Sequence, residues 1–256
     1  MNAIDPPLNP VAYKNEDFLD SDDARPLRIL AEYIQPMQAF HHEHICDTIV
    51  FFGSARIAPA GPLGRYYEEA RELARLVTTW SKSLPSHSKR YVVCTGGGPG
   101  ILEAANRGAS DAAGRTIGLN IGLPHEQRPN PYITRELSFE FHYFFMRKLW
   151  FAYLARALVV FPGGFGTLDE LFEILTLAQT EKLNRRIPVV LYGSGHWNEI
   201  INFEALVRHG MISREDLALF HFADDPATAL RLLQQGIGET PEEAVPAFAH
   251  SRTPHC

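Results

Sequence analysis

The segment that follows an apolar run near the middle of the chain has the residue types needed to hold an anion. The run ALVVF is followed by PGGFGTLDE at 162–170. Glycines let the backbone approach a ligand closely, and their N–H groups, with the first turn of a following helix, form a site for phosphate. The predicted phosphate ligands are Gly163, Gly164, Gly166 and Thr167.

Glu170 has two interpretations. Thr167 and Glu170 have the spacing of a capping box, in which both side chains only satisfy free backbone donors at the start of a helix. Alternatively, the Glu170 carboxylate lies beside the bound ligand and takes part in its chemistry. A capping box does not require the three glycines that precede it.

Two further loops follow apolar runs. The sequence TGGGPG at 95–100 comes before a helical pattern, and we predict that Gly97 and Gly98 contact the ligand. The alternative is a tight turn that packs the helix close to its strand. The spacing is neither GxGxxG nor GxxxxGK[ST], so it is neither a dinucleotide fingerprint nor a P-loop. In the other loop, GSAR at 53–56, Ser54 could contact a phosphate or ribose oxygen, or the loop is an ordinary turn.

Arg147 and Lys148 lie inside the apolar stretch FFMRKLWF at 144–151. A buried unpaired guanidinium is costly, so Arg147 is expected to face a carboxylate or an anionic ligand. The alternative is a surface helix whose long side chains reach solvent over an aromatic inner face.

The elements that must position these residues alternate along the chain. The expected strands are 48–53, 91–96, 116–121, 137–144, 157–161, 187–192 and 219–222. The expected helices are 66–80, 100–113, 146–154, 168–183 and 226–235. This alternation predicts an α/β fold with a doubly wound, mainly parallel, Rossmann-like sheet. Ligands bind at the carboxyl ends of such strands, which is where the three loops lie.

We expect a single domain at 25–238 that begins with a helical extension at 25–44, which Pro36 bends or divides. Residues 1–24 are expected to form a flexible arm and residues 239–256 a flexible tail.

Composition narrows the classes of function. The net charge of −6 argues against a protein that clamps long nucleic acids. Cys46, Cys94 and Cys256 are far apart without zinc-site spacing, so we expect no metal site and three reduced thiols. The N-terminus has no signal-peptide pattern, and no apolar run approaches membrane-spanning length, so we expect a cytoplasmic protein that does not enter membranes.

Together, FGSAR (52–56), GGGPG (96–100), the RK pair (147–148) and PGGFGTLDE (162–170) resemble the Lonely Guy (LOG) family, over about residues 45–222. Its members are cytokinin riboside 5′-monophosphate phosphoribohydrolases, many of them labelled lysine decarboxylases. They use water to cleave an adenine-type nucleotide into free base and ribose 5-phosphate, without metal or cofactor.

The resemblance implies that Arg147 and Glu170 are the catalytic pair and that residues 163–167 bind the 5′-phosphate. It also implies that Met146 and Lys148 lie at the base pocket, and that the protein forms a homodimer or larger homo-oligomer. This chain has FFMRK where plant members have a histidine, so AMP is an alternative substrate.

Two other functions remain open. A non-catalytic nucleotide-binding or carrier protein, including a molybdenum-cofactor carrier, would use the same loops. A pyridoxal phosphate decarboxylase would need a Schiff-base lysine, and Lys148 beside Arg147 is poorly suited to that role.

Overall fold

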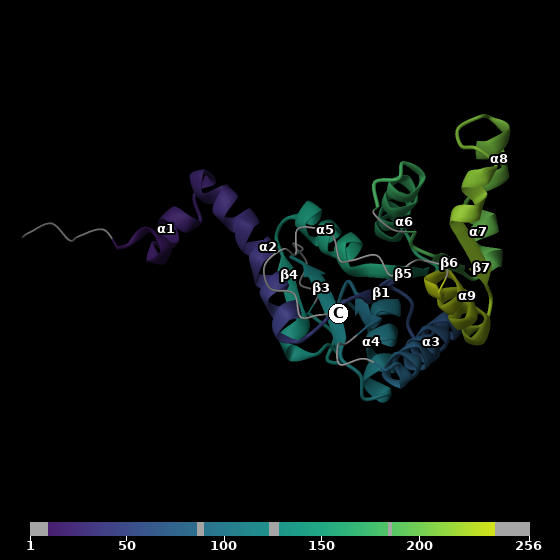
Figure 1. The fold of residues 1–256 in the computed structure, drawn as a ribbon, viewed down its shortest axis with the longest axis horizontal. Helices are drawn as coiled ribbons and strands as arrows, with labels where there is room; N and C mark the ends of the chain where they lie inside the picture. The colour runs from purple at the N-terminus through teal and green to yellow at the C-terminus, as the bar shows by residue number, and fades with distance from the viewer. Residues whose placement is uncertain (1–9, 86–89, 123–127, 184–185, 239–256) are drawn as a thin grey trace, which may run out of the picture.

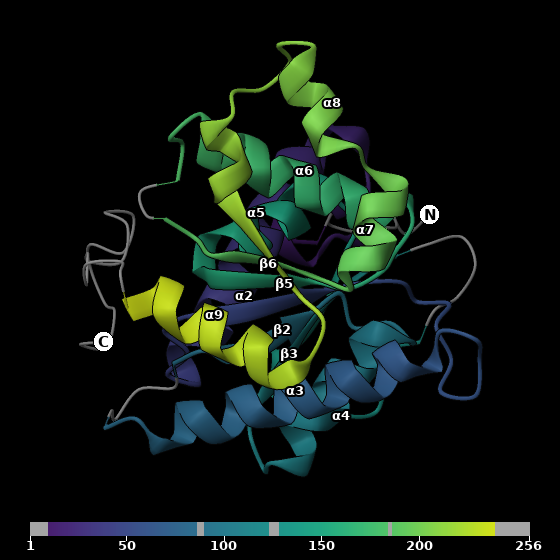
Figure 2. The same cartoon turned by 90° about the vertical axis from the view of Figure 1, so that its right-hand side faces the viewer.

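The computed structural model describes residues 10–85, 90–122, 128–183 and 186–238. These residues form one seven-stranded sheet with helices on both faces (Figures 1 and 2). The expected tail at 239–256 and the first nine residues of the expected arm lie outside the described residues.

All seven strands run parallel, in the order β4-β3-β2-β1-β5-β6-β7. The strands are β1 Thr48–Phe52, β2 Val92–Thr95, β3 Thr116–Ile121, β4 Ser138–Phe141, β5 Ala155–Val160, β6 Val189–Tyr192 and β7 Phe220–Ala223. The strands β1, β2, β5 and β6 are buried along their whole lengths because helices cover both faces. The doubly wound α/β fold is therefore confirmed.

The helices divide into two layers (Figure 2). One layer consists of α3 Gly64–Ser83, α4 Ile101–Asp111 and α9 Pro226–Gly238. The other consists of α2 Arg25–His42, α5 Phe144–Leu154, α6 Phe165–Gln179, α7 Ser194–Ile200 and α8 Phe203–Arg208. Short 3-10 turns η3 Arg135–Leu137 and η4 Glu215–Leu219 precede β4 and β7. Each layer buries its own apolar cluster against the sheet.

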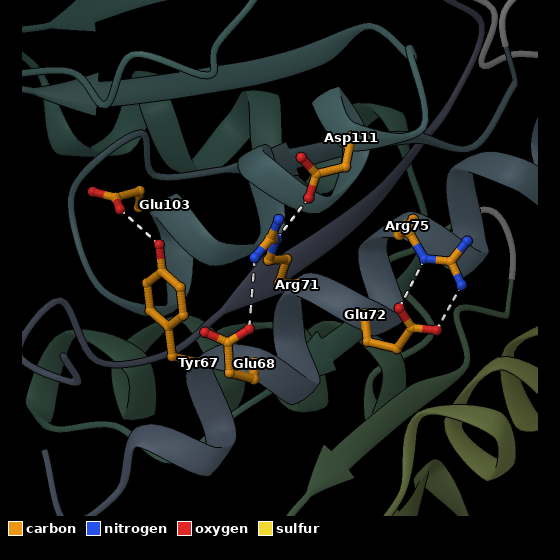
Figure 3. A network of polar contacts seen from close by, with 7 residues as sticks. All are labelled: Tyr67, Glu68, Arg71, Glu72, Arg75, Glu103 and Asp111. Carbon is orange, nitrogen blue, oxygen red and sulfur yellow. Dashed lines mark hydrogen bonds and ion pairs between the residues drawn. The ribbon is translucent and has the colours of Figure 1, made fainter. Parts of the chain in front are cut away.

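The helices α3 and α4 pack unusually close together. A Cβ atom at Gly108 would overlap the backbone carbonyl of Arg71, so the contact requires a glycine. Polar contacts cross the same seam (Figure 3): Arg71 Nε lies 2.6 Å from Asp111 Oδ2, and the Tyr67 hydroxyl donates to Glu103 at 2.7 Å. These contacts fix α4, which directly follows loop 95–100, against α3.

The expected helical extension is present as α2, which is continuous from Arg25 to His42. Pro36 lies inside α2 and does not divide it. The Tyr33 ring stacks on Trp150 of α5 with ring centroids 5.5 Å apart. The Glu32 carboxylate accepts the N–H groups of His142 and Tyr143, which immediately precede α5. The extension therefore holds the start of the helix that carries Arg147.

Several expectations need correction. Residues 12–24 contain η1 Ala12–Lys14, α1 Glu16–Leu19 and η2 Asp22–Ala24, none of which was predicted. Helices α7 and α8 were also missed, and the strand expected at 137–144 ends at Phe141 because α5 begins at Phe144. Cys94 is a buried free thiol, but Cys46 is disulfide-bonded, so the expectation of three reduced thiols is wrong.

Candidate functional site

Three loops meet at the carboxyl ends of the central strands. The Ser54 N–H, after β1, donates to the carbonyl of Pro162 after β5 at 3.0 Å. The Ser54 carbonyl accepts the N–H of Ile101, at the start of α4, at 3.1 Å. Ser54 thus links the other two loops through its backbone, and its hydroxyl accepts the N–H of Arg56. The chain leaves β1 toward one face of the sheet and leaves β5 toward the other, and such a switch point is where open α/β sheets bind ligands.

The glycine loop after β5 leads into α6, which begins at Phe165 with Gly164 as its N-cap and no side-chain cap. Thr167 and Glu170 therefore lie inside the helix, and both are buried. The capping-box interpretation of this pair is wrong, because the helix starts three residues before the position that a capping box requires.

The three glycines of this loop differ in their surroundings. A Cβ atom at Gly163 would overlap the side chain of Thr167, whereas no heavy atom lies within 4 Å of the Cβ positions of Gly164 and Gly166. Both of these glycines are exposed. The Cβ positions of Gly164 and Gly166 thus face open space at the N-terminus of α6, where an anion could bind.

Arg147 and Glu170 form a buried ion pair. Arg147 Nη2 lies 3.1 Å from Glu170 Oε1, and the side chains are 14% and 6% exposed. Burial raises the pKa of Glu170 above its usual range, although the charges of Arg147 and Lys148 act in the opposite direction. The Nε atom of Arg147 is buried without a hydrogen-bond partner. The pair therefore has a donor left over and a carboxylate that accepts a proton more readily than usual.

The same arginine reaches the loop after β2. A Cβ atom at Gly96 would lie 3.9 Å from Arg147 Nη1, so this loop and the α5–α6 pair border one space. Gly97 and Gly98 are buried. Gly97 has a φ of +74° and packs so closely on Asn120 that a side chain would collide with it. Its N–H already donates to the Thr95 hydroxyl at 2.9 Å, which was not expected for a phosphate ligand.

The two residues assigned to the base pocket, Met146 and Lys148, are held by contacts within the protein. Met146 is buried within the apolar cluster of α5 and the sheet. Lys148 Nζ lies 2.8 Å from Asp169 and 2.7 Å from Glu173. Burial lowers the pKa of Lys148, but its hydrogen bonds to these two carboxylates outweigh this and raise the pKa overall. Lys148 is therefore held as a charged ammonium group.

Sequence patterns did not predict a cavity of about 270 Å³ beside Ser54 and Gly163. The residues around it are Ser54, Arg56, Ile57, Ala58, Gly61, Pro62, Leu63, Pro162, Gly163 and His196. His196, on α7, has a buried Nε2 atom with no partner, and burial lowers the pKa of its imidazole. A single histidine outside any motif gave no signal in the sequence.

A family model described as "Possible lysine decarboxylase" matches residues 102–233, just over half of the chain. The chain belongs to that family. This is the family that the loop motifs indicated, since LOG phosphoribohydrolases carry the same label. The match covers loop-bearing elements from α4 to α9, including Arg147 and Glu170.

Curated relatives include two plant LOG proteins. The Oryza sativa subsp. japonica protein named probable cytokinin riboside 5′-monophosphate phosphoribohydrolase LOG4 is 26% identical over 147 residues, 56% of this chain and 62% of that protein. The Arabidopsis thaliana cytokinin riboside 5′-monophosphate phosphoribohydrolase LOG3 is 27% identical over 190 residues, 70% of this chain and 76% of that protein. The chain thus spans under two thirds of the first relative and about three quarters of the second.

Solved structures support the fold. A structural-genomics X-ray structure superimposes with a TM-score of 0.53 at 22% identity, covering 74% of this chain and 99% of the other. The Moco carrier protein from Chlamydomonas reinhardtii superimposes with a TM-score of 0.50 at 25% identity, covering 75% of this chain and 98% of that protein.

Among the described residues, no group of three or more His, Cys, Asp or Glu side chains is arranged to hold a metal ion. No helix in the same part of the chain is long and apolar enough to cross a bilayer.

Proposed function

We propose that this protein is a nucleoside 5′-monophosphate N-glycosidase. It would release a free adenine-type base and ribose 5-phosphate from AMP or from cytokinin riboside monophosphates. The observation that carries the proposal is the buried Arg147–Glu170 pair, which borders two glycine loops at the switch point of the sheet. The names of the plant relatives support the same reaction class.

The geometry suits this chemistry. The exposed backbone at Gly164 and Gly166, at the N-terminus of α6, would bind the 5′-phosphate, with Gly163 and Thr167 shaping the loop. Breaking the bond between ribose and base builds positive charge on the ribose, which the Glu170 carboxylate would stabilise. Its raised pKa suits a group that takes a proton from the attacking water. Arg147 would orient Glu170 and offset the charge of the departing base.

The test is to incubate the purified protein with AMP and with an N6-substituted adenosine monophosphate, and to separate free base by chromatography. We expect Glu170→Gln to lower kcat by roughly 10²–10⁴-fold, the usual contribution of a general base. Glu173→Gln is the matched control, since Glu173 lies on the same helix and pairs with Lys148 instead. If wild-type protein releases base from no purine or pyrimidine monophosphate, the proposal is rejected.

A non-catalytic carrier is the second candidate, and the similarity to the Moco carrier protein favours it. Tight nucleotide binding by wild-type protein without base release would support this alternative. Glu170→Gln would then leave the affinity for AMP nearly unchanged.

The family description also suggests lysine decarboxylation, but the residues do not fit it. A Schiff base with pyridoxal phosphate forms through a neutral lysine amine. Lys148, beside the site, is held in its charged form by Asp169 and Glu173.

We also propose a homodimer or larger homo-oligomer in the cytoplasm, acting on small nucleotides rather than on nucleic acids or membranes. Apolar side chains on α5 and α6 are exposed near the site, namely Phe144, Phe145, Leu149 and Phe172. Their exposure in one chain suits burial by a second copy. Light scattering coupled to size exclusion measures the oligomeric state, and a monomer at micromolar concentration would contradict this part of the proposal.

A further inference from the structure

Behind the triple-glycine loop lies a buried side-chain amide that the sequence motifs do not include. Asn130 is 6% exposed. Its backbone N–H donates to the Gly97 carbonyl at 2.8 Å. Its side-chain Nδ2 donates to the carbonyls of Gly97 at 3.0 Å and Gly98 at 3.1 Å, and to Asn106 Oδ1 at 2.8 Å.

The partners of Asn130 fix the orientation of its amide. Its Oδ1 accepts the N–H of Tyr132 at 3.2 Å, and an N–H group can only donate. The carbonyl groups on the other side can only accept, so the NH2 end must face them. Asn106 is itself anchored, because its Nδ2 donates to the Thr116 hydroxyl and to the Ile117 carbonyl. Asn130 is therefore one member of a fully satisfied buried network, which is a rigid arrangement.

This network determines where the donors of the loop point. In a trans peptide the C=O and the following N–H point in opposite directions, and none of the described peptide bonds is cis. Because Asn130 holds the Gly97 carbonyl, the Gly98 N–H points away from the network. The two neighbouring residues offer no free donor, since the Gly97 N–H is bound to Thr95 and Pro99 has no N–H.

The Gly98 N–H has no acceptor among the described residues, although Gly98 is buried. A buried backbone donor without a partner is rare in folded proteins, because it costs about as much as a lost hydrogen bond. A ligand oxygen would complete it. The adjoining Gly96 lies beside Arg147, so such an oxygen would sit in the same space as the Arg147–Glu170 pair.

We propose that Asn130 is a positioning residue that locks the Gly97–Gly98 peptide so that the Gly98 N–H donates to a phosphoryl oxygen of the nucleotide. The inference rests on the proposed function for the identity of the ligand. Asn130 touches no substrate atom and acts only through the backbone of the loop. The sequence predicted that Gly97 contacts the ligand. In this proposal Gly97 does not contact it, because Thr95 and Asn130 bind its backbone and fix the loop.

The first experiment compares wild-type protein with Asn130→Asp, which keeps the acceptor for Tyr132 and turns an oxygen toward the two glycine carbonyls. We expect KM for AMP to rise roughly 10- to 100-fold with kcat within about twofold, because a phosphate contact is equally strong in ground and transition states. The Kd for ribose 5-phosphate, measured by calorimetry, should rise by the same factor.

The matched control is Thr134→Val. The Thr134 hydroxyl accepts the N–H of Thr116 at 3.0 Å, at the far end of the same network, and does not touch the glycine loop. A merely structural effect would appear equally in Thr134→Val, as a lower Tm and a smaller active fraction. We expect that variant to keep the wild-type KM and Kd.

A second measurement does not depend on a variant of Asn130. Wild-type protein labelled with ¹⁵N-glycine is titrated with inorganic phosphate and then with ribose 5-phosphate, and Gly98 is assigned from the spectrum of Gly98→Ala. We expect the Gly98 amide proton to move downfield while the Gly97 amide stays in place. The titration remains informative if Asn130→Asp does not fold.

These results separate the inference from the proposed function. Base release by wild-type protein with an unchanged KM in Asn130→Asp overturns the role of Asn130 and leaves the function standing. Absence of base release, with a Gly98 shift and weaker ribose 5-phosphate binding in Asn130→Asp, overturns the function and supports the inference. A shift at Gly97 but not at Gly98, or no phosphate binding at all, overturns the inference.

Discussion

The Arg147–Glu170 pair makes a double-mutant cycle informative. Both side chains are largely buried and their charged atoms lie 3.1 Å apart. Removing one member of a buried ion pair leaves an uncompensated charge and costs about 3–5 kcal/mol of folding free energy. At roughly 2–4 °C per kcal/mol for a chain of this size, Arg147→Met should lower Tm by about 6–20 °C at neutral pH. The double variant Arg147→Met/Glu170→Gln removes both charges and should recover most of that loss.

The loss should also depend on pH, with a sign that follows from the pKa of Glu170. Burial raises this pKa above the ordinary value of 4.5, despite the opposing charges of Arg147 and Lys148. A carboxyl with a raised folded-state pKa stabilises the fold while protonated, and this contribution disappears as pH rises through the folded pKa. Without Arg147 the pKa rises further. The penalty of Arg147→Met should therefore be small in acid and grow toward neutral pH.

Urea unfolding followed by far-UV circular dichroism, at several values between about pH 4 and pH 8, measures these free energies. Base release from AMP, measured on the same samples below their unfolding range, reports the functional role separately. Additive costs of the two single substitutions, or a penalty for Arg147→Met that does not change with pH, would refute the idea that the two charges are coupled.

Three glycines give further predictions. Gly166→Ala places a methyl group in open space within α6. The higher helix propensity of alanine should raise Tm by about 1–4 °C in calorimetry. The same methyl group enters the space proposed for the ligand, so steady-state kinetics should show a higher KM. Gly163→Ala forces the side chain of Thr167 aside, so steady-state kinetics should show weaker AMP binding with a larger KM than in Gly166→Ala. Gly108→Ala pushes α4 away from the carbonyl of Arg71. Overpacking of this kind costs about 1–3 kcal/mol of folding free energy, so Tm should fall by roughly 2–12 °C in thermal unfolding. The steady-state kinetics at low temperature should be unchanged.

Much of the sheet could be predicted from the sequence. Strands buried on both faces are continuous apolar runs. Runs such as ALVVF and TIVFF can therefore be recognised as strands from the local sequence alone, without knowledge of the strands that pair with them. Helices α7 and α8 were missed because they are short and lack a clear apolar period. The start of α6 was misplaced by three residues, because Gly164 provides its N-cap with backbone geometry alone.

The convergence of the motif loops could be predicted from the sequence, but the hydrogen bonds within the loops could not. The carboxyl ends of neighbouring parallel strands share one edge, so the motif loops had to converge, and a guanidinium in an apolar stretch required a carboxylate. That Thr95 occupies the Gly97 N–H, and that Asn130 holds the same glycine from a distant segment, depends on tertiary contacts. No residue spacing encodes them.

The position of β1 in the sheet bears on how the chain is made. Val50 pairs with Cys94 on one side and with Leu158 on the other, so one edge of β1 stays open until β5 has been synthesised. At ordinary elongation rates this interval of about 100 residues lasts roughly 5–20 s. During that time an apolar strand edge is available to other nascent chains. The proposed ligand site includes the loop after β5 and the N-terminus of α6. A ligand therefore cannot bind and protect the open edge of β1 until α6 has been synthesised.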